Sequence, residues 1–231
     1  WSFPLLAARG YVIFIADSAM RRGTPMHDVA DTVLPGVNKL VAMGIADPKR
    51  LGVFGWSWGG YSTLSLIAQT DRFKAAVAGS GISNLLTFYA ALHSDGTDWT
   101  GFGESNQGHI GGTPWQYRQR YVESSPFFYL DRVRTPVLLE YGDADTTVDP
   151  FNSRETFVAL RRLGKIATLV DYTGEGHVLS KLSNQIDFSK RMIDWFDKYL
   201  KADVEKGNVA EKTSAANYDK KCASEAGAVK K

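Results

Sequence analysis

The segment LGVFGWSWGGYSTLSLIAQ, residues 51–69, carries Ser57 in the pattern Gly-x-Ser-x-Gly. The short apolar run Leu51–Trp56 predicts a buried strand, and the apolar stretch Gly59–Gln69 predicts a helix. On a sharp turn between a strand and a helix, a serine hydroxyl is lifted clear of the sheet. The flanking glycines are expected to avoid side chains that would collide with the turn. The backbone N–H of Trp58 is expected to face a developing oxyanion, so the turn predicts a nucleophilic serine.

The rest of the chain alternates strand and helix patterns, which indicates a mainly parallel sheet with helices on both faces. The predicted strands are Tyr11–Ala16, Leu51–Trp56, Ala75–Ser80, Pro136–Tyr141 and Ala167–Tyr172. The predicted helices are Pro25–Met43, Gly59–Gln69, Pro114–Glu123, a helix capped by Asp149 that begins at Pro150 and stops at Gly164, and a last helix with Ile186, Ile193, Phe196 and Leu200 on one face. Residues 81–113, rich in glycine, serine, threonine and asparagine, predict helix pieces and a long surface loop.

The chain length of 231 residues allows one large domain with a sizeable core. Residues 1–200 are expected to form a catalytic domain that is incomplete at its N-terminus. Residues 201–231 contain no leucine, isoleucine, phenylalanine or tryptophan, so this charged tail is expected to be disordered.

The net charge of +2 gives no case for a nucleic-acid partner or an anionic membrane surface. Apolar runs such as Val12–Ala16 are far too short to span a bilayer. Cys222 is the only cysteine, so no internal disulfide can form and the redox compartment stays open. The chain starts at Trp1 rather than at a methionine, so the lack of a signal peptide leaves the localisation unknown.

A serine hydroxyl needs a base to take its proton, and the base needs an acid to orient it. Two loops downstream of the serine supply both, in the chain order Ser, Asp, His that is typical of the α/β-hydrolase fold. The loop after the strand Pro136–Tyr141 contains Asp145, the preferred acid. Asp143 remains the alternative, although its place directly after a turn glycine is typical of a turn residue. Asp149 is better explained as a helix cap.

The base is predicted to be His177, which follows the strand Ala167–Tyr172 at the sheet edge where catalytic groups gather. His27 precedes the serine, and His93 and His109 lie in the irregular region before the acid, so each is expected to be a surface or packing histidine. The four histidines show no close ligand spacing, so no metal site is predicted.

Over nearly all of residues 1–200, the sequence resembles the prolyl oligopeptidase family of serine peptidases. The resemblance is carried by LAARGYVIFI (residues 6–15), DPKRLGVFGWSWGGYSTL (47–64), SPFFYLDRVRTPVLLEYGDADTTVDPFNS (125–153) and LRRLGKIATLVDYTGEGHVL (160–179). Tyr141 departs from the pattern, since many members have histidine before this glycine. That position is not catalytic, so the departure leaves the assignment intact.

The resemblance implies that Ser57, Asp145 and His177 form a catalytic triad that cleaves short peptides through an acyl-enzyme, without a cofactor. It also implies that Trp58 and Val148 line the pocket for the residue before the scissile bond. Family members carry an N-terminal β-propeller that screens out large substrates. This sequence shows none, so a propeller is expected in the full-length parent.

By the same resemblance, the second oxyanion donor comes from a glycine-rich segment upstream of Tyr11–Ala16, before the first residue of this chain. The strand that lies between Tyr11–Ala16 and Leu51–Trp56 is also absent. We therefore expect a C-terminal fragment whose N-terminal strands are missing. Either Tyr11–Ala16 pairs directly with Leu51–Trp56, or the sheet is left with a gap, and both arrangements would weaken catalysis.

Two other functions are consistent with these residues. A carboxylesterase of the same fold would share the triad and the nucleophile turn, although the segments around Asp145 and His177 favour a peptidase. A non-catalytic scaffold is the third possibility, and the intact triad argues against it for the parent protein.

Overall fold

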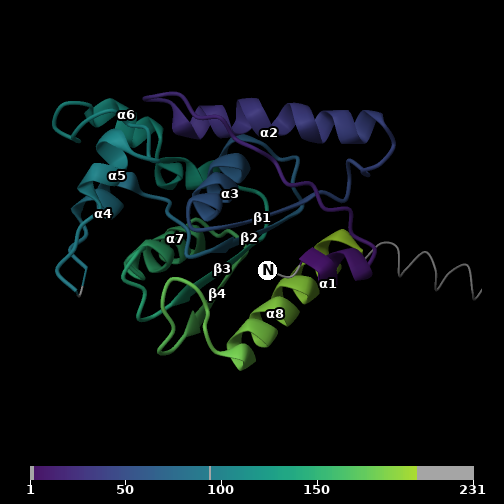
Figure 1. Ribbon diagram of the computed structural model, residues 1–231. Coiled ribbons are helices and arrows are strands. Elements are labelled where there is room, and N and C mark those ends of the chain that lie inside the picture. Colours follow the sequence, from purple (N-terminus) through teal and green to yellow (C-terminus); the bar gives the residue numbers. More distant parts are fainter. Residues whose placement is uncertain (1–2, 94, 202–231) are drawn as a thin grey trace, which may run out of the picture.

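The structure, a computed structural model, describes residues 3–93 and 95–201. Its strands form one parallel sheet in the order β1-β2-β3-β4 (Figure 1). They are β1 (Gly52–Trp56), β2 (Ala75–Gly79), β3 (Val137–Gly142) and β4 (Ala167–Tyr172). The sequence predicts each of these four strands to within one residue. Of the predicted tail 201–231, everything after Lys201 lies outside the described residues.

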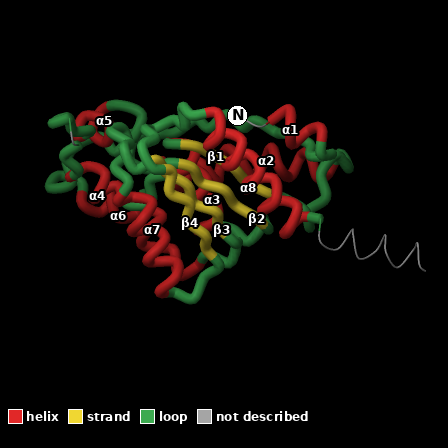
Figure 2. The backbone as a smooth tube through the Cα atoms, turned by 90° about the horizontal axis from the view of Figure 1, so that it is seen from below, coloured by secondary structure: helices red, strands yellow, loops and turns green. Residues whose placement is uncertain are grey.

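Helices cover both faces of this sheet, as predicted. They are α1 (Phe3–Ala8), α2 (Pro25–Ala42), α3 (Trp58–Gln69), α4 (Leu85–Ala90), α5 (Thr100–Ser105), α6 (Arg118–Glu123), the 3-10 helix η1 (Pro126–Arg132), α7 (Phe151–Arg162) and α8 (Leu182–Leu200). Helices α2, α3 and α7 pack on one face of the sheet, and α1 and α8 pack on the other. Figure 2 shows the strands enclosed between these helices. The architecture is therefore the predicted layered α/β arrangement.

The predicted ends of the two long helices on the first face are close to those observed. Helix α2 begins at Pro25, whose fixed φ suits the first helical position, and the chain leaves it through Gly44 at φ 71°. Helix α7 begins at Phe151, one residue later than predicted. Asp149 caps it nevertheless, because its Oδ1 accepts the Phe151 N–H at 2.7 Å.

Two predictions for the region between β2 and β3 are wrong in part. The helix predicted over Pro114–Glu123 begins only at Arg118. Residues 81–113 do contain helix pieces, α4 and α5, but Ile82 and Ile110 are fully buried. Tertiary packing therefore brings part of this polar segment into the core.

The buried face of α8 starts later than predicted. Ile193, Phe196 and Leu200 are buried as expected, but Ile186 is 60% exposed. The helix buries no side chain before Phe188, so its first turn lies beyond the apolar cluster on this face of the sheet.

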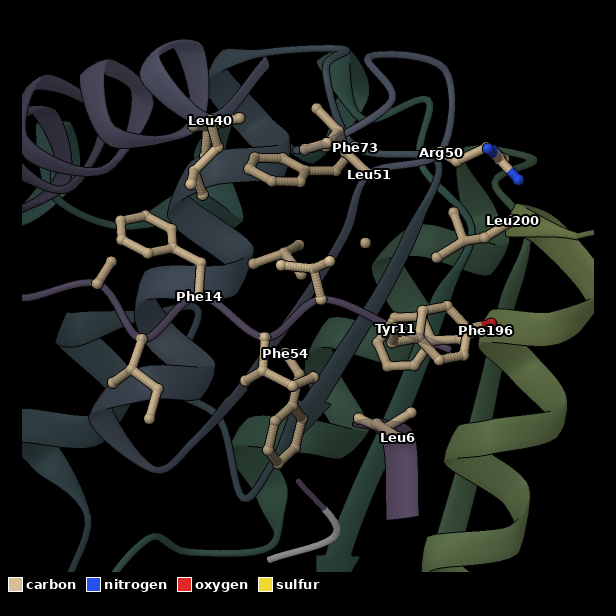
Figure 3. Close-up of a pocket in the computed structure, with 18 of the residues that line it drawn as sticks. Leu6, Tyr11, Phe14, Leu40, Arg50, Leu51, Phe54, Phe73, Phe196 and Leu200 are labelled. Atoms are coloured by element: carbon tan, nitrogen blue, oxygen red, sulfur yellow. The ribbon is translucent and has the colours of Figure 1, made fainter. Parts of the chain in front are cut away.

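The prediction of a strand at Tyr11–Ala16 is wrong. The segment forms no strand, and within the described residues no backbone hydrogen bond joins it to β1. A cavity of about 500 Å³ lies between them, lined by apolar side chains from this segment, from β1 and from α8 (Figure 3). A strand exists only where a neighbour accepts its hydrogen bonds, and this segment lies too far from β1 to pair. Of the two arrangements expected, the structure therefore has the gap.

Candidate active site

Ser57 lies at the junction of β1 and α3. Its backbone has φ 57° and ψ −119°, a conformation that a residue with a side chain rarely adopts. The Ser57 N–H donates to the Gly79 carbonyl at 2.8 Å, and the Ser57 carbonyl accepts from the Tyr61 N–H at 3.0 Å. These two bonds hold the strained residue in place, so the structure contains the sharp strand–turn–helix that the sequence predicts.

Two of the three glycines around Ser57 are required by close packing. A Cβ on Gly55 would lie 2.0 Å from the Gly59 carbonyl oxygen, and one on Gly60 would lie 2.7 Å from Gly81 Cα. Gly59 differs, because a Cβ there would meet no atom within 4 Å. The expectation that flanking glycines avoid collisions is therefore confirmed at Gly55 and Gly60 and wrong at Gly59.

Asp145 and His177 are brought together by the loops that follow β3 and β4. The Asp145 Oδ2 atom lies 2.8 Å from His177 Nδ1, and the carboxylate is buried. Its other oxygen, Oδ1, accepts the backbone N–H groups of Thr147 at 2.7 Å and Val148 at 2.9 Å. With both oxygens engaged, the carboxylate is fixed in one orientation toward the imidazole.

The other two carboxylates of the acid loop have different partners. Asp143 Oδ1 accepts the Gly174 N–H at 2.6 Å, which ties the acid loop to the base loop. Asp149 caps α7. In the part of the chain that the structure describes, Asp145 is thus the only one of the three that bonds His177.

The two loops approach so closely that Gly142 has no room for a side chain. A Cβ on this residue would lie 2.3 Å from the Glu175 carbonyl oxygen and 2.5 Å from that of Gly176. The Ala144 N–H also donates to the Glu175 carbonyl at 2.9 Å. Direct backbone contact therefore sets the relative position of the acid and the base.

Among the described residues, the third member of the predicted triad, Ser57, makes no side-chain hydrogen bond to the other two. Across residues 3–93 and 95–201, no hydrogen bond joins Ser57 Oγ to His177 Nε2. The structure thus forms one of the two hydrogen bonds that a triad uses.

The predicted pocket residues Trp58 and Val148 are both buried, at 8% and 3% exposure. The Trp58 ring stacks on Tyr61 with 3.9 Å between ring centroids. Because Trp58 opens α3, its backbone N–H has no acceptor within the helix and is available to a ligand. A role for the two side chains in substrate binding stays a prediction.

Glu175 is a site residue that the sequence reasoning missed. It is buried, and its carboxylate accepts the Ser180 N–H at 2.6 Å, the Ser180 hydroxyl at 2.8 Å, the Lys181 N–H at 3.1 Å and the Asn184 amide at 2.6 Å. These donors, the Ser180 N–H first, lower the pKa of Glu175 to about 2. Glu175 therefore holds the base loop against the start of α8. Its position two residues before His177 could have indicated in the sequence that Glu175 helps to hold the His177 loop.

Glu140 is a second missed carboxyl group, and it has the opposite surroundings. It lies in β3, fully buried, and within the described part of the chain neither carboxylate oxygen has a hydrogen-bond partner. Burial, and then the nearby negative charge of Asp145, raise the pKa of Glu140 to about 9. These surroundings favour the protonated form of Glu140, which the sequence pattern does not reveal.

The remaining histidines lie apart from this pair. His27 is exposed, His109 is half-buried and His93 is buried. Among the described residues, no three histidine, cysteine or acidic side chains gather closely enough to hold a metal ion. Across the same residues, no helix has both the length and the apolar character needed to cross a membrane.

The parallel sheet, the strained serine turn and the Asp–His pair at the carboxyl ends of the strands define an α/β-hydrolase. Solved peptidase structures share this fold. A puromycin-hydrolyzing peptidase from Mycobacterium tuberculosis matches with a TM-score of 0.70 and 31% identity, over 78% of this chain and 26% of that one. An acylaminoacyl peptidase from Pyrococcus horikoshii matches with a TM-score of 0.67 and 28% identity, over 78% of this chain and 29% of that one.

The chain belongs to the prolyl oligopeptidase family, which matches residues 1–203. The uncharacterized peptidase YuxL of Bacillus subtilis is 30% identical over 220 residues, covering 86% of this chain and 31% of the relative. The acylamino-acid-releasing enzyme of Arabidopsis thaliana is 31% identical over 178 residues, covering 76% of this chain and 23% of the relative. The resemblance seen in the sequence is thus confirmed, and the chain spans less than a third of the length of these two relatives.

Proposed function

We propose that the protein containing this chain is a serine peptidase that hydrolyses short peptides, with Ser57 as nucleophile, His177 as base and Asp145 as orienting acid. The observation that carries the proposal is the 2.8 Å contact between Asp145 Oδ2 and His177 Nδ1, at the same carboxyl-terminal end of the parallel strands as the strained Ser57. The family and its named peptidases support the substrate class.

In the proposed reaction, Ser57 Oγ attacks the carbonyl carbon of the scissile bond while His177 Nε2 takes its proton. The C–N bond then breaks as the imidazolium returns that proton to the leaving amine, and an ester to Ser57 remains. Water then attacks the ester carbon while the same imidazole takes a proton from it. The bond from that carbon to Ser57 Oγ breaks, the imidazolium returns the proton to Oγ, and the peptide acid leaves. Asp145 accepts the Nδ1–H and so keeps Nε2 ready to accept a proton. The Trp58 N–H stabilises the oxyanion.

The remaining parts are proposed to come from the longer protein. These are a strand in the gap beside β1, a second oxyanion donor and a β-propeller that restricts access. The open edge of β1 supports the first. The family resemblance supports all three, and the relatives' greater length is consistent with them.

The experiment that tests the function is covalent labelling combined with a substrate comparison. A phosphonate probe should form one adduct, at Ser57. Ser57→Ala should abolish labelling, and Ser62→Ala, one turn further along α3, should retain it. Labelling that persists in Ser57→Ala would disprove the assignment. Hydrolysis of an aminoacyl arylamide is expected alongside that of a simple ester, and cleavage of the ester alone would identify a carboxylesterase instead.

A further inference from the structure

Trp56, the last residue of β1, reaches across the sheet to the base loop. Its indole Nε1–H donates to the backbone carbonyl of His177 at 2.9 Å. Strands β1 and β4 lie at opposite edges of the four-stranded sheet, with β2 and β3 between them. This side chain therefore links the strand of the nucleophile directly to the residue that carries the base.

Neighbours in β2 and α8 help to hold the indole ring in place. A Cβ on Gly79 of β2 would lie 2.2 Å from Trp56 Cε3, so the ring crosses β2 at a position that must lack a side chain. Phe188 of α8 packs edge-on against the ring, with centroids 5.5 Å apart and planes at 78°. The ring is thus confined between a strand backbone and a helix, and its N–H has little freedom to leave the His177 carbonyl.

His177 is consequently held at two points. Asp145 binds ring atom Nδ1 at 2.8 Å, and Trp56 binds the backbone carbonyl, with Ser80 Oγ as a longer contact at 3.5 Å. Fixing the carbonyl and one ring nitrogen together restricts where the other nitrogen, Nε2, can point. That nitrogen must accept the proton of Ser57, which is the residue next to Trp56 in the chain.

We infer that Trp56 is a positioning residue whose indole N–H sets the His177 loop at the correct distance from Ser57. The inference rests on the proposed peptidase function. Trp56 touches no reacting atom and acts through His177. A small misplacement of a catalytic base lowers turnover strongly while leaving substrate binding nearly unchanged.

The test is Trp56→Phe in the full-length native polypeptide, which removes the N–H and keeps an aromatic ring. Turnover of an aminoacyl arylamide should fall roughly tenfold with KM changed by less than about twofold, as expected for the loss of one orienting hydrogen bond. Trp195→Phe is the matched control, because the Trp195 indole N–H has no hydrogen-bond partner among the residues that the structure describes. This control should keep the wild-type kcat.

A second comparison separates positioning from a general loss of structure. In a His177→Ala background there is no imidazole to position, so adding Trp56→Phe should leave the residual hydrolysis unchanged. A further drop in that background would show that the tryptophan only supports the fold, and would overturn the inference. Melting temperatures of all variants are recorded alongside.

If Trp56→Phe does not fold, Gly79→Ala tests the same contact with the tryptophan retained. The added methyl group would displace the indole, and kcat should fall with KM nearly unchanged. Gly101→Ala, where a Cβ meets no atom within 4 Å, is its control. Suppose that the wild-type protein hydrolyses the arylamide and that Trp56→Phe or Gly79→Ala is as active as its control. That result would refute the positioning role and leave the proposed function standing. A wild-type protein that neither hydrolyses the arylamide nor reacts with the phosphonate would refute the proposed function itself.

Discussion

The two edges of the sheet differ in how completely they are built. At β3 and β4, the loops interlock through Gly142, Asp143 and Glu175, and the Asp145–His177 hydrogen bond forms at 2.8 Å. At β1, residues 11–16 make no backbone hydrogen bond to the strand, and a cavity of about 500 Å³ separates them.

The difference shows which half of the site this chain can assemble by itself. The proposed acid and base come from neighbouring strands, and the groups that lock their two loops together lie within residues 137–184, with Trp56 and Ser80 as added contacts to the His177 carbonyl. The nucleophile belongs to a strand with one open edge, and its hydrogen bond to the base is not formed. An unpaired strand edge exposes backbone groups that a neighbour would otherwise satisfy. The site is therefore well ordered on the acid–base side and incomplete on the nucleophile side.

The largest expected effect is on the well-ordered side. Asp145→Asn should lower turnover of the full-length protein by about 10⁴, because an amide in this place favours the wrong imidazole tautomer. The fold should be retained, since an asparagine oxygen can still accept the N–H groups of Thr147 and Val148. Steady-state kinetics and a thermal melt check both parts. Asp143→Asn is the control, and a larger loss there than at Asp145 would show that the acid has been assigned to the wrong carboxylate.

The next effect is on the open side. Two proteins are compared: residues 1–231 alone, and the same chain extended at its N-terminus by the residues that the gene encodes before Trp1. The first should turn over an aminoacyl arylamide about 10²–10³ times more slowly than the second. The Trp58 N–H is proposed to supply one oxyanion donor, and the extension is proposed to supply the second and the strand beside β1. Equal turnover in the two forms would mean that the gap beside β1 does not matter for catalysis.

The last effect concerns stability rather than turnover and tests whether Glu140 is neutral. The pKa of Glu140 is raised from 4.5 to about 9 in the fold, so between these values the folded chain binds more protons than the unfolded chain. Its contribution to stability is therefore fully present below pH 4.5 and is lost as the pH rises toward 9, by up to about 1.4 kcal/mol per pH unit. Glu140→Gln should remove this slope.

Urea unfolding between pH 5 and 8 measures the slope. The Glu140→Gln variant should gain stability over the wild type as the pH rises, whereas the exposed control Glu123→Gln should not. Parallel stability curves for Glu140→Gln and the wild type would show that Glu140 ionises normally, and that the acid–base side is less tightly packed than its burial indicates.

The sequence by itself determined the strands β1 to β4 and the turn at Ser57, and it predicted the pair Asp145 and His177, with Asp143 as the alternative acid. These features are local. A short apolar run that alternates with helical patterns predicts a buried strand. A strained turn needs glycines beside it, as at Gly55 and Gly60.

The tertiary structure decided the features that depend on distant neighbours. Whether residues 11–16 form a strand depends on a partner within hydrogen-bonding reach, and none is present in the described chain. The raised pKa of Glu140 comes from its burial beside Asp145, and the bond from Trp56 to His177 joins residues 121 positions apart. Periodicity and spacing describe how residues relate to their neighbours along the chain. Hydrogen-bond partners, burial and charge between strands arise only once the sheet is assembled.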